Sequence, residues 1–81
     1  MNISSLVVAP EPGQSGAVME RLAKIDGLEV THLLDDGRII VVIERESTSE
    51  EAKAMRSIIE TGGVATASLA YHYFEEETLE R

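Results

Sequence analysis

The chain lacks cysteine, and this absence removes several functional classes at once. Disulfide frameworks, thiolate metal sites and CxxC redox motifs all need cysteine, so none of them is available. Aromatic residues are also few: two tyrosines, one phenylalanine and no tryptophan among 81 residues. All of them fall in the stretch ASLAYHYFEEE at 67–77. The first question is therefore whether this stretch is an active site, a binding edge or a strand of the core.

Basic residues are scarce as well, with seven Lys and Arg against fifteen Asp and Glu and a formal net charge of −8. Such a surface repels phosphate backbones, so nucleic acid is not an expected partner. It would attract a basic partner, and the alternative is that the acidity serves solubility alone. No apolar run is long enough to span a bilayer, so membrane insertion is not expected. The first residues, MNISSLVVAPEPG, carry no basic segment and reach proline too early for a signal peptide. We therefore expect a cytoplasmic protein.

The length allows one small domain, which buries only about 60% of the surface that its unfolded chain exposes. The apolar fraction of 43% is normal for a folded domain, so disorder is not expected. The last residues, EEETLER, have little to bury and are expected to fray. We predict a domain over residues 1–74 and an acidic C-terminal tail over residues 75–81.

Apolar stretches rich in Val and Ile predict strands, and each is bounded by Gly, Pro or Asp. The turn between the second and third strands is the hairpin signal DDG at 35–37. The predicted strands are residues 3–9, 28–34, 38–44 and 64–74.

Two helices are predicted between these strands. The first covers residues 15–25, where Val18, Leu22 and Ile25 recur at helical spacing. The second begins at residue 47 or 48, because Ser47 with Glu50 and Thr48 with Glu51 both fit a capping box, and it ends before Gly62-Gly63.

The resulting order is β-α-β-β-α-β, which predicts an α+β protein with the ferredoxin-like fold. Right-handed crossovers place both helices on one face of a four-stranded antiparallel sheet. The first and third strands then occupy the centre of the sheet, and the second and fourth form its edges.

The helix-free face of this sheet, here called the open face, is unusually apolar at its centre. The third strand is apolar on both sides, yet two helices can cover only one side, and exposed apolar patches often mark a partner surface. If Ile39, Val41 and Ile43 faced outward, Glu44 would point under the helices without a partner, which is costly. We therefore assign Leu6, Val8, Ile39, Val41 and Ile43 to the core.

Alternation then defines the open face. In the fourth strand, the smaller and more polar set, which includes Phe74, is expected on the open face, whereas Leu69, Tyr71 and Tyr73 are expected to pack under the helices. A bulge after Gly63 would invert this assignment. Besides Ile3, the predicted open-face residues are Ser5, Val7, Ile40, Val42, Ser68, Ala70 and His72.

Acidic residues are expected to gather at one end of the sheet. The fourth strand is expected to end beside the turn between the second and third strands. Asp35 and Asp36 of that turn would then meet Glu75, Glu76 and Glu77 and form an acidic rim. An apolar face with such a rim suits a peptide that is basic at one end and apolar beyond it.

No residue pattern indicates catalysis. His72 lacks a recognisable acid, nucleophile or anion site, and His32 lies on the opposite edge strand, so a shared metal is not expected. The loop after the first strand has no arginine to bind phosphate, and no GxxxxGK[ST] loop is present. We expect no catalytic residue, no metal and no cofactor.

Three stretches together resemble the NapD family: SSLVV in the first strand, GRIIVVIE before and in the third, and GGVATASLAYHYFE in the fourth. The likeness is concentrated in Ser5 to Val8, Ile39 to Glu44 and Ser68 to His72, whereas the first helix and THLLDD carry little of it. The resemblance implies a ferredoxin-like chaperone for assembly of the periplasmic nitrate reductase subunit NapA. Members of this family bind the twin-arginine signal peptide of their client and delay Tat export until the molybdenum cofactor is inserted.

On this hypothesis the seven open-face residues from Ser5 to His72 bind the signal peptide and the acidic rim attracts its arginines. The alternative is a homodimeric ligand-sensing or regulatory domain that buries the open face against a second copy. A chaperone would be a monomer or a weak homodimer.

Overall fold

The structure, a computed structural model, describes residues 2–74, and for residues 71–74 it describes the backbone alone. Its elements follow the predicted order, and the ferredoxin-like fold is confirmed. They are β1 (Asn2–Pro10), α1 (Ser15–Leu22), β2 (Leu28–Leu33), β3 (Ile39–Arg45), α2 (Thr48–Ile59) and β4 (Val64–Phe74). The predicted tail at 75–81 lies outside the described residues.

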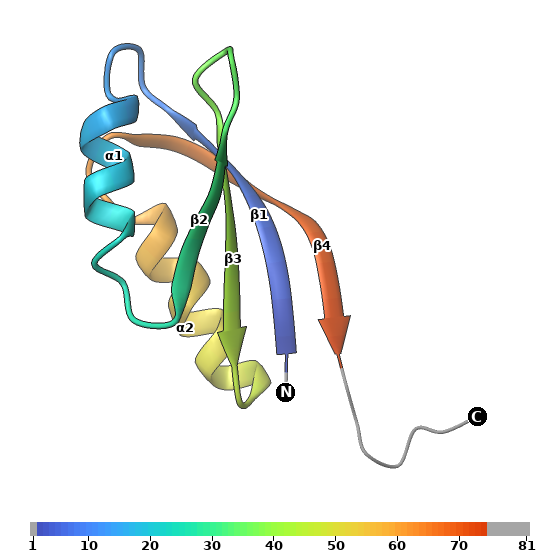
Figure 1. Cartoon of the computed structure of the whole chain (residues 1–81). Coiled ribbons are helices and arrows are strands. Elements are labelled where there is room, and N and C mark those ends of the chain that lie inside the picture. The colour runs from blue at the N-terminus through green and yellow to red at the C-terminus, as the bar shows by residue number, and fades with distance from the viewer. Residues whose placement is uncertain (1, 75–81) are drawn as a thin grey trace.

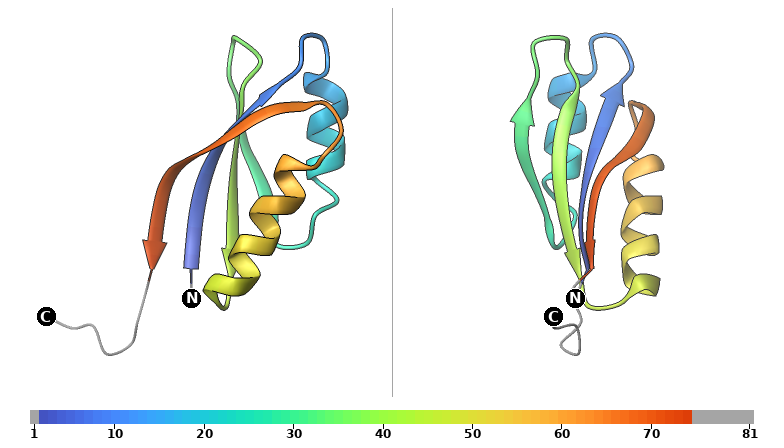
Figure 2. Two further views of the ribbon diagram at one scale, coloured as in Figure 1. Left: turned by 180° about the vertical axis from the view of Figure 1, so that it is seen from behind. Right: turned by 90° about the vertical axis from the view of Figure 1, so that its right-hand side faces the viewer.

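The four strands form one antiparallel sheet in the order β2-β3-β1-β4. Both helices lie on the same side of it (Figures 1 and 2), as right-handed crossovers require. The first helix ends at Leu22, three residues earlier than predicted, since the chain turns there and the amide of Ile25 bonds the carbonyl of Leu22 at 3.0 Å. Ile25 still packs against the core from this turn.

The core lies between the sheet and the helices. Its five predicted strand residues are at most 3% exposed, so the inward parity of β1 and β3 is confirmed. The full set of buried apolar residues is Leu6, Val8, Val18, Leu22, Ile39, Val41, Ile43, Ala54 and Ile58.

Two glycines make the returns from helix to strand possible. Gly27 and Gly63 immediately precede β2 and β4, with φ of 75° and 94°, a region that side chains disfavour. A Cβ on Gly63 would also lie 2.8 Å from Val18 Cγ2 in the core. Arg21 of α1 closes this corner, because its Nη1 donates to the carbonyl oxygen of Gly62 at 2.7 Å.

A buried polar cluster joins the start of β1 to the start of α2. Only Ser47 caps the helix, accepting from the amide of Glu50 at 3.1 Å. Glu51 is not part of a capping box, since its side chain turns inward and the residue is 4% exposed. The Ser4 hydroxyl donates to Oε2 of Glu51, and Asn2 Nδ2 donates to Oε1 of the same carboxylate at 3.1 Å. This Asn2–Ser4–Glu51 cluster pairs the buried Asn2 and Ser4 donors with a carboxylate, although Asn2 Oδ1 itself has no hydrogen-bond partner among the described residues.

Replacing Glu51→Ala is expected to lower the free energy of unfolding by about 2–4 kcal/mol, because it leaves the buried Ser4 and Asn2 donors without this acceptor. The measurement is urea unfolding followed by circular dichroism. Glu20→Ala, at an exposed position of α1, is the matched control and should change stability by less than about 0.5 kcal/mol. Equal stability of the two variants would show that the cluster does not stabilise the fold.

Candidate functional site

The open face is built by the residues that alternate with the core along β1 and β3. Register places Ser5 opposite Val42, and Val7 opposite both Ile40 of β3 and Ser68 of β4. These five predicted residues therefore lie on one face. The central four are half-buried and Ser68 is exposed. The arrangement is an apolar bed with hydroxyl groups beside it, on the side of the sheet that neither helix covers (Figure 2).

The fourth strand departs from the prediction at Ala70. Register pairs Leu6 with Leu69 but Ser5 with Tyr71, so Ala70 is an extra, bulged residue. Beyond the bulge, the backbone of His72 lies opposite Ser4, which is on the helix side. The expectation that Ser68 and His72 share one parity is therefore wrong. Whether the side chain of His72 contacts a ligand stays a prediction, because that side chain lies outside those described.

Leu69 also differs from the prediction, which placed it under the helices. Its parity is inward, opposite Leu6, yet 54% of its surface is exposed. The strand is sharply bent along its course (Figures 1 and 2), and bulges bend the strands that contain them. An edge residue beside the bulge therefore has no helix packed over it.

The predicted acidic rim is not assembled as expected. Because β1 and β3 are antiparallel, Asn2 at the start of β1 lies opposite Arg45 at the end of β3, and the end of β4 lies beside it. Asp35 and Asp36 are at the other end of the sheet, where Ser15 Oγ donates to the carbonyl of Gly37 at 3.1 Å (Figure 1). We call the end of the sheet at Asn2 and Arg45 the Arg45 end, and the end at Asp35 and Asp36 the hairpin end. Glu75, Glu76 and Glu77 lie outside the described residues.

Charge at the hairpin end is partly neutralised within the turn. The amide of Arg38 donates to Asp36 Oδ1 at 3.1 Å, and its Nε donates to Oδ2 at 2.8 Å. The backbone hydrogen bond, aided by the guanidinium, holds the pKa of Asp36 below its usual value. Asp36 is therefore already engaged by an internal arginine.

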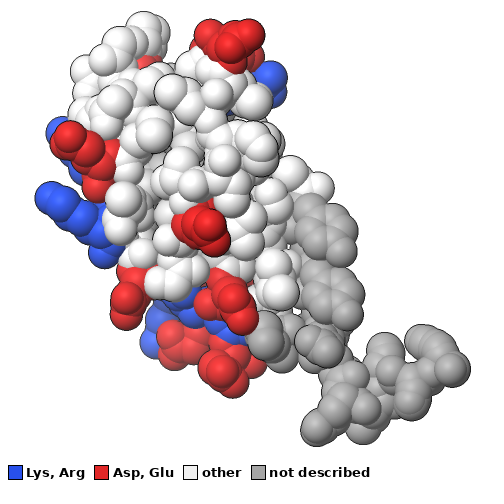
Figure 3. All heavy atoms as spheres, in the orientation of Figure 1, with Lys and Arg blue, Asp and Glu red and all other residues white. Residues whose placement is uncertain are grey.

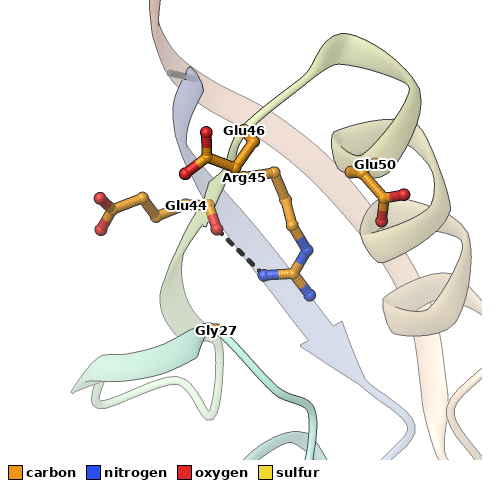
Figure 4. Close-up of a pocket in the computed structure, with 5 residues that line it drawn as sticks. All are labelled: Gly27, Glu44, Arg45, Glu46 and Glu50. Atoms are coloured by element: carbon orange, nitrogen blue, oxygen red, sulfur yellow. Dashed lines mark hydrogen bonds between the residues drawn. The ribbon is translucent and has the colours of Figure 1, made fainter.

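The Arg45 end contains a shallow pocket of about 420 Å³ (Figure 4). Glu44, Arg45 and Glu46 line it from the end of β3, Glu50 from α2, and Gly27 from the start of β2. The Arg45 guanidinium donates to the backbone carbonyls of Glu44 and Asp26. Figure 4 shows the Glu44 carboxylate pointing away from this guanidinium, as expected of neighbours on opposite faces of a strand.

Residues outside the predicted site also lie on the open face. Glu29 of β2 is exposed opposite Val42, and a register shift at Thr31 brings His32 opposite Ile40. The open-face position of Glu29 could have been predicted from the sequence LEVTHL, because the apolar Leu28 and Val30 on either side of it belong on the helix side. The parity of His32 could not, because nothing in that sequence marks the shift.

Among residues 2–70 no three His, Asp or Glu side chains are grouped as metal ligands. Neither described helix has the length and apolarity to cross a membrane. What the geometry does provide is a broad apolar bed bordered by carboxylates, an arrangement that suits recognition of a chain segment.

The comparisons with known proteins agree with this fold. The chain is similar to the solution structure of the E. coli Tat proofreading chaperone protein NapD, with a TM-score of 0.80 and 30% sequence identity. That match covers 98% of this chain and 84% of the other. A search of curated proteins gave no significant match. The family described as NapD protein matches residues 1–76. The resemblance seen in the sequence is thereby confirmed, and the chain belongs to the NapD family.

Proposed function

We propose that this protein is a cytoplasmic proofreading chaperone that binds the twin-arginine signal peptide of NapA on its open face. Binding delays Tat export until the cofactor is inserted. The observation that carries the proposal is the half-buried apolar bed formed by Val7, Ile40 and Val42 on a NapD-family chain. The related E. coli protein is a Tat proofreading chaperone, which supports the same role here.

The chemistry of the proposed ligand matches this surface. A twin-arginine signal peptide has an arginine pair followed by a moderately apolar stretch, so it needs an apolar bed with negative charge nearby. The protein supplies the bed on its open face and a net charge of −8. Acidic character also steers a basic ligand toward the surface before contact.

The proposed role needs binding and no chemical step, so the protein is not proposed as an enzyme. It also requires the open face to stay accessible. We therefore propose a monomer or a weak homodimer. Light scattering separates this from the dimeric regulatory domain, because a tight dimer through the open face would leave no room for the peptide.

The central test is isothermal titration calorimetry of the purified chain with a synthetic NapA twin-arginine signal peptide. A peptide in which Lys-Lys replaces Arg-Arg is the control. We expect saturable binding of the Arg-Arg peptide and weaker binding of the Lys-Lys peptide, because a planar guanidinium forms bidentate bonds with carboxylates. Absence of heat with either peptide at high micromolar protein would refute the proposed function.

Replacing Val7→Glu is expected to weaken peptide binding by at least about ten-fold, because Val7 lies between Ile40 and Ser68 and an unpaired carboxylate there would be buried beneath the apolar part of the ligand. Ala52→Glu adds the same charge at an exposed position of α2, on the helix side, and should leave the affinity within about two-fold. Fluorescence anisotropy of a labelled peptide measures both variants, and circular dichroism checks their folding. Equal affinities would place the peptide away from the open face.

A further inference from the structure

We infer that Glu29 of β2 and Glu44 of β3 receive the two arginine side chains of the signal peptide and set its direction on the open face. This inference rests on the proposed function and adds a defined contact to it. It replaces the acidic rim expected from the sequence, since register separates Asp35 and Asp36 from the end of β4.

Register brings the two carboxylates together on the open face. Glu29 is directly opposite Val42, and Glu44 follows Val42 by two residues on the same side of β3. The two glutamates are therefore diagonal neighbours on adjacent antiparallel strands, a relation that corresponds to about 7–8 Å. Both are exposed, and both border the apolar bed through Val42. Two acceptors at this spacing suit two long adjacent side chains that each end in a guanidinium.

Both carboxylates are available to a ligand. Within residues 2–70 neither Glu29 nor Glu44 forms a side-chain hydrogen bond or an ion pair. Arg45, the nearest cation along the chain, donates instead to backbone carbonyls on the other side of β3 (Figure 4). In the view of Figure 3 the surface over the strands is largely uncharged, with carboxylates within it and Lys or Arg only at its margins.

The opposite end of the face is a poorer place for the arginines. Asp36 there is already paired with Arg38, and Asp35 lies in the turn beyond Leu33 and Ile39, the last paired residues of β2 and β3. The register shift also brings His32, not an acid, opposite Ile40. The charge difference between the ends gives the bound peptide a direction. The arginine pair lies at the Arg45 end, and the apolar stretch runs over Val42 and Ile40 toward the hairpin end.

The test is a double-mutant cycle that crosses two proteins with two peptides. The proteins are the wild type and the Glu29→Gln, Glu44→Gln variant, and the labelled peptides carry Arg-Arg or Gln-Gln at the twin-arginine position. Glutamine keeps the size of each side chain and removes its charge. The matched control is Glu20→Gln, Glu60→Gln, which makes the same charge change at two exposed positions outside the sheet. Affinities are measured by anisotropy at low ionic strength, where exposed charge pairs are least screened.

We expect the Glu29, Glu44 variant to bind the Arg-Arg peptide about ten-fold more weakly, and the Glu20, Glu60 control to stay within about two-fold of wild type. With the Gln-Gln peptide, wild type and both variants should bind alike. If the two double variants lose the same affinity for the Arg-Arg peptide, the inference is overturned while the proposed function stands. If wild type does not bind the Arg-Arg peptide at all, the proposed function fails and this inference fails with it.

Discussion

The structure depends on one mismatch, between a sheet that is apolar on both sides at its centre and two helices that can cover only one side. Val41 and Ile43 of β3 are completely buried against the helices, while Ile40 and Val42 of the same strand face the other way and are only half-buried. A folded domain of this size has no further layer to place over them. The apolar centre of the open face is therefore a consequence of the fold, and a bound segment is the simplest way to cover it.

The Asn2–Ser4–Glu51 cluster fixes the start of β1 against α2 at the Arg45 end of the open face. Asn2 and Ser4 alternate with the open-face residues Ile3 and Ser5, so the hydrogen bonds to Glu51 hold the underside of the strand that carries the bed. Buried hydrogen bonds of this kind favour one arrangement, because a shift of β1 against α2 would separate the Asn2 and Ser4 donors from the Glu51 carboxylate. Apolar packing alone would tolerate small slips of β1 against α2.

The sequence was sufficient for the element order and for the parity of β1 and β3, because a single unpaired Glu44 excluded the other parity. It was not sufficient for β4, where the bulge at Ala70 depends on how an edge strand bends and is not marked by glycine or proline. The prediction that Asp35 and Asp36 lie beside the end of β4 was wrong for a topological reason. β4 and β3 both pair antiparallel with β1, so the end of β4 lies beside the end of β3, at the opposite end of the sheet from the hairpin. The inward turn of Glu51 was not predicted because Thr48 and Glu51 also fit a capping box, whereas in the structure Ser47 caps the helix.

Affinity and direction come from different parts of such a surface. Exposed ion pairs contribute about 0–1 kcal/mol each, whereas each buried aliphatic side chain contributes about 1.5–3 kcal/mol. In the proposed binding mode the apolar bed would therefore dominate the free energy of binding. An apolar bed alone, however, would accept any amphipathic segment in either direction. If Glu29 and Glu44 receive the arginines as inferred, they would penalise the reversed peptide, because its arginines would then meet Arg38 and His32 while Glu29 and Glu44 stayed unpaired. In the proposed mode, selectivity for a basic pair ahead of an apolar stretch needs more acid beside the face at one end than at the other. The internal Asp36–Arg38 pair contributes to that asymmetry by neutralising one of the two carboxylates at the hairpin end.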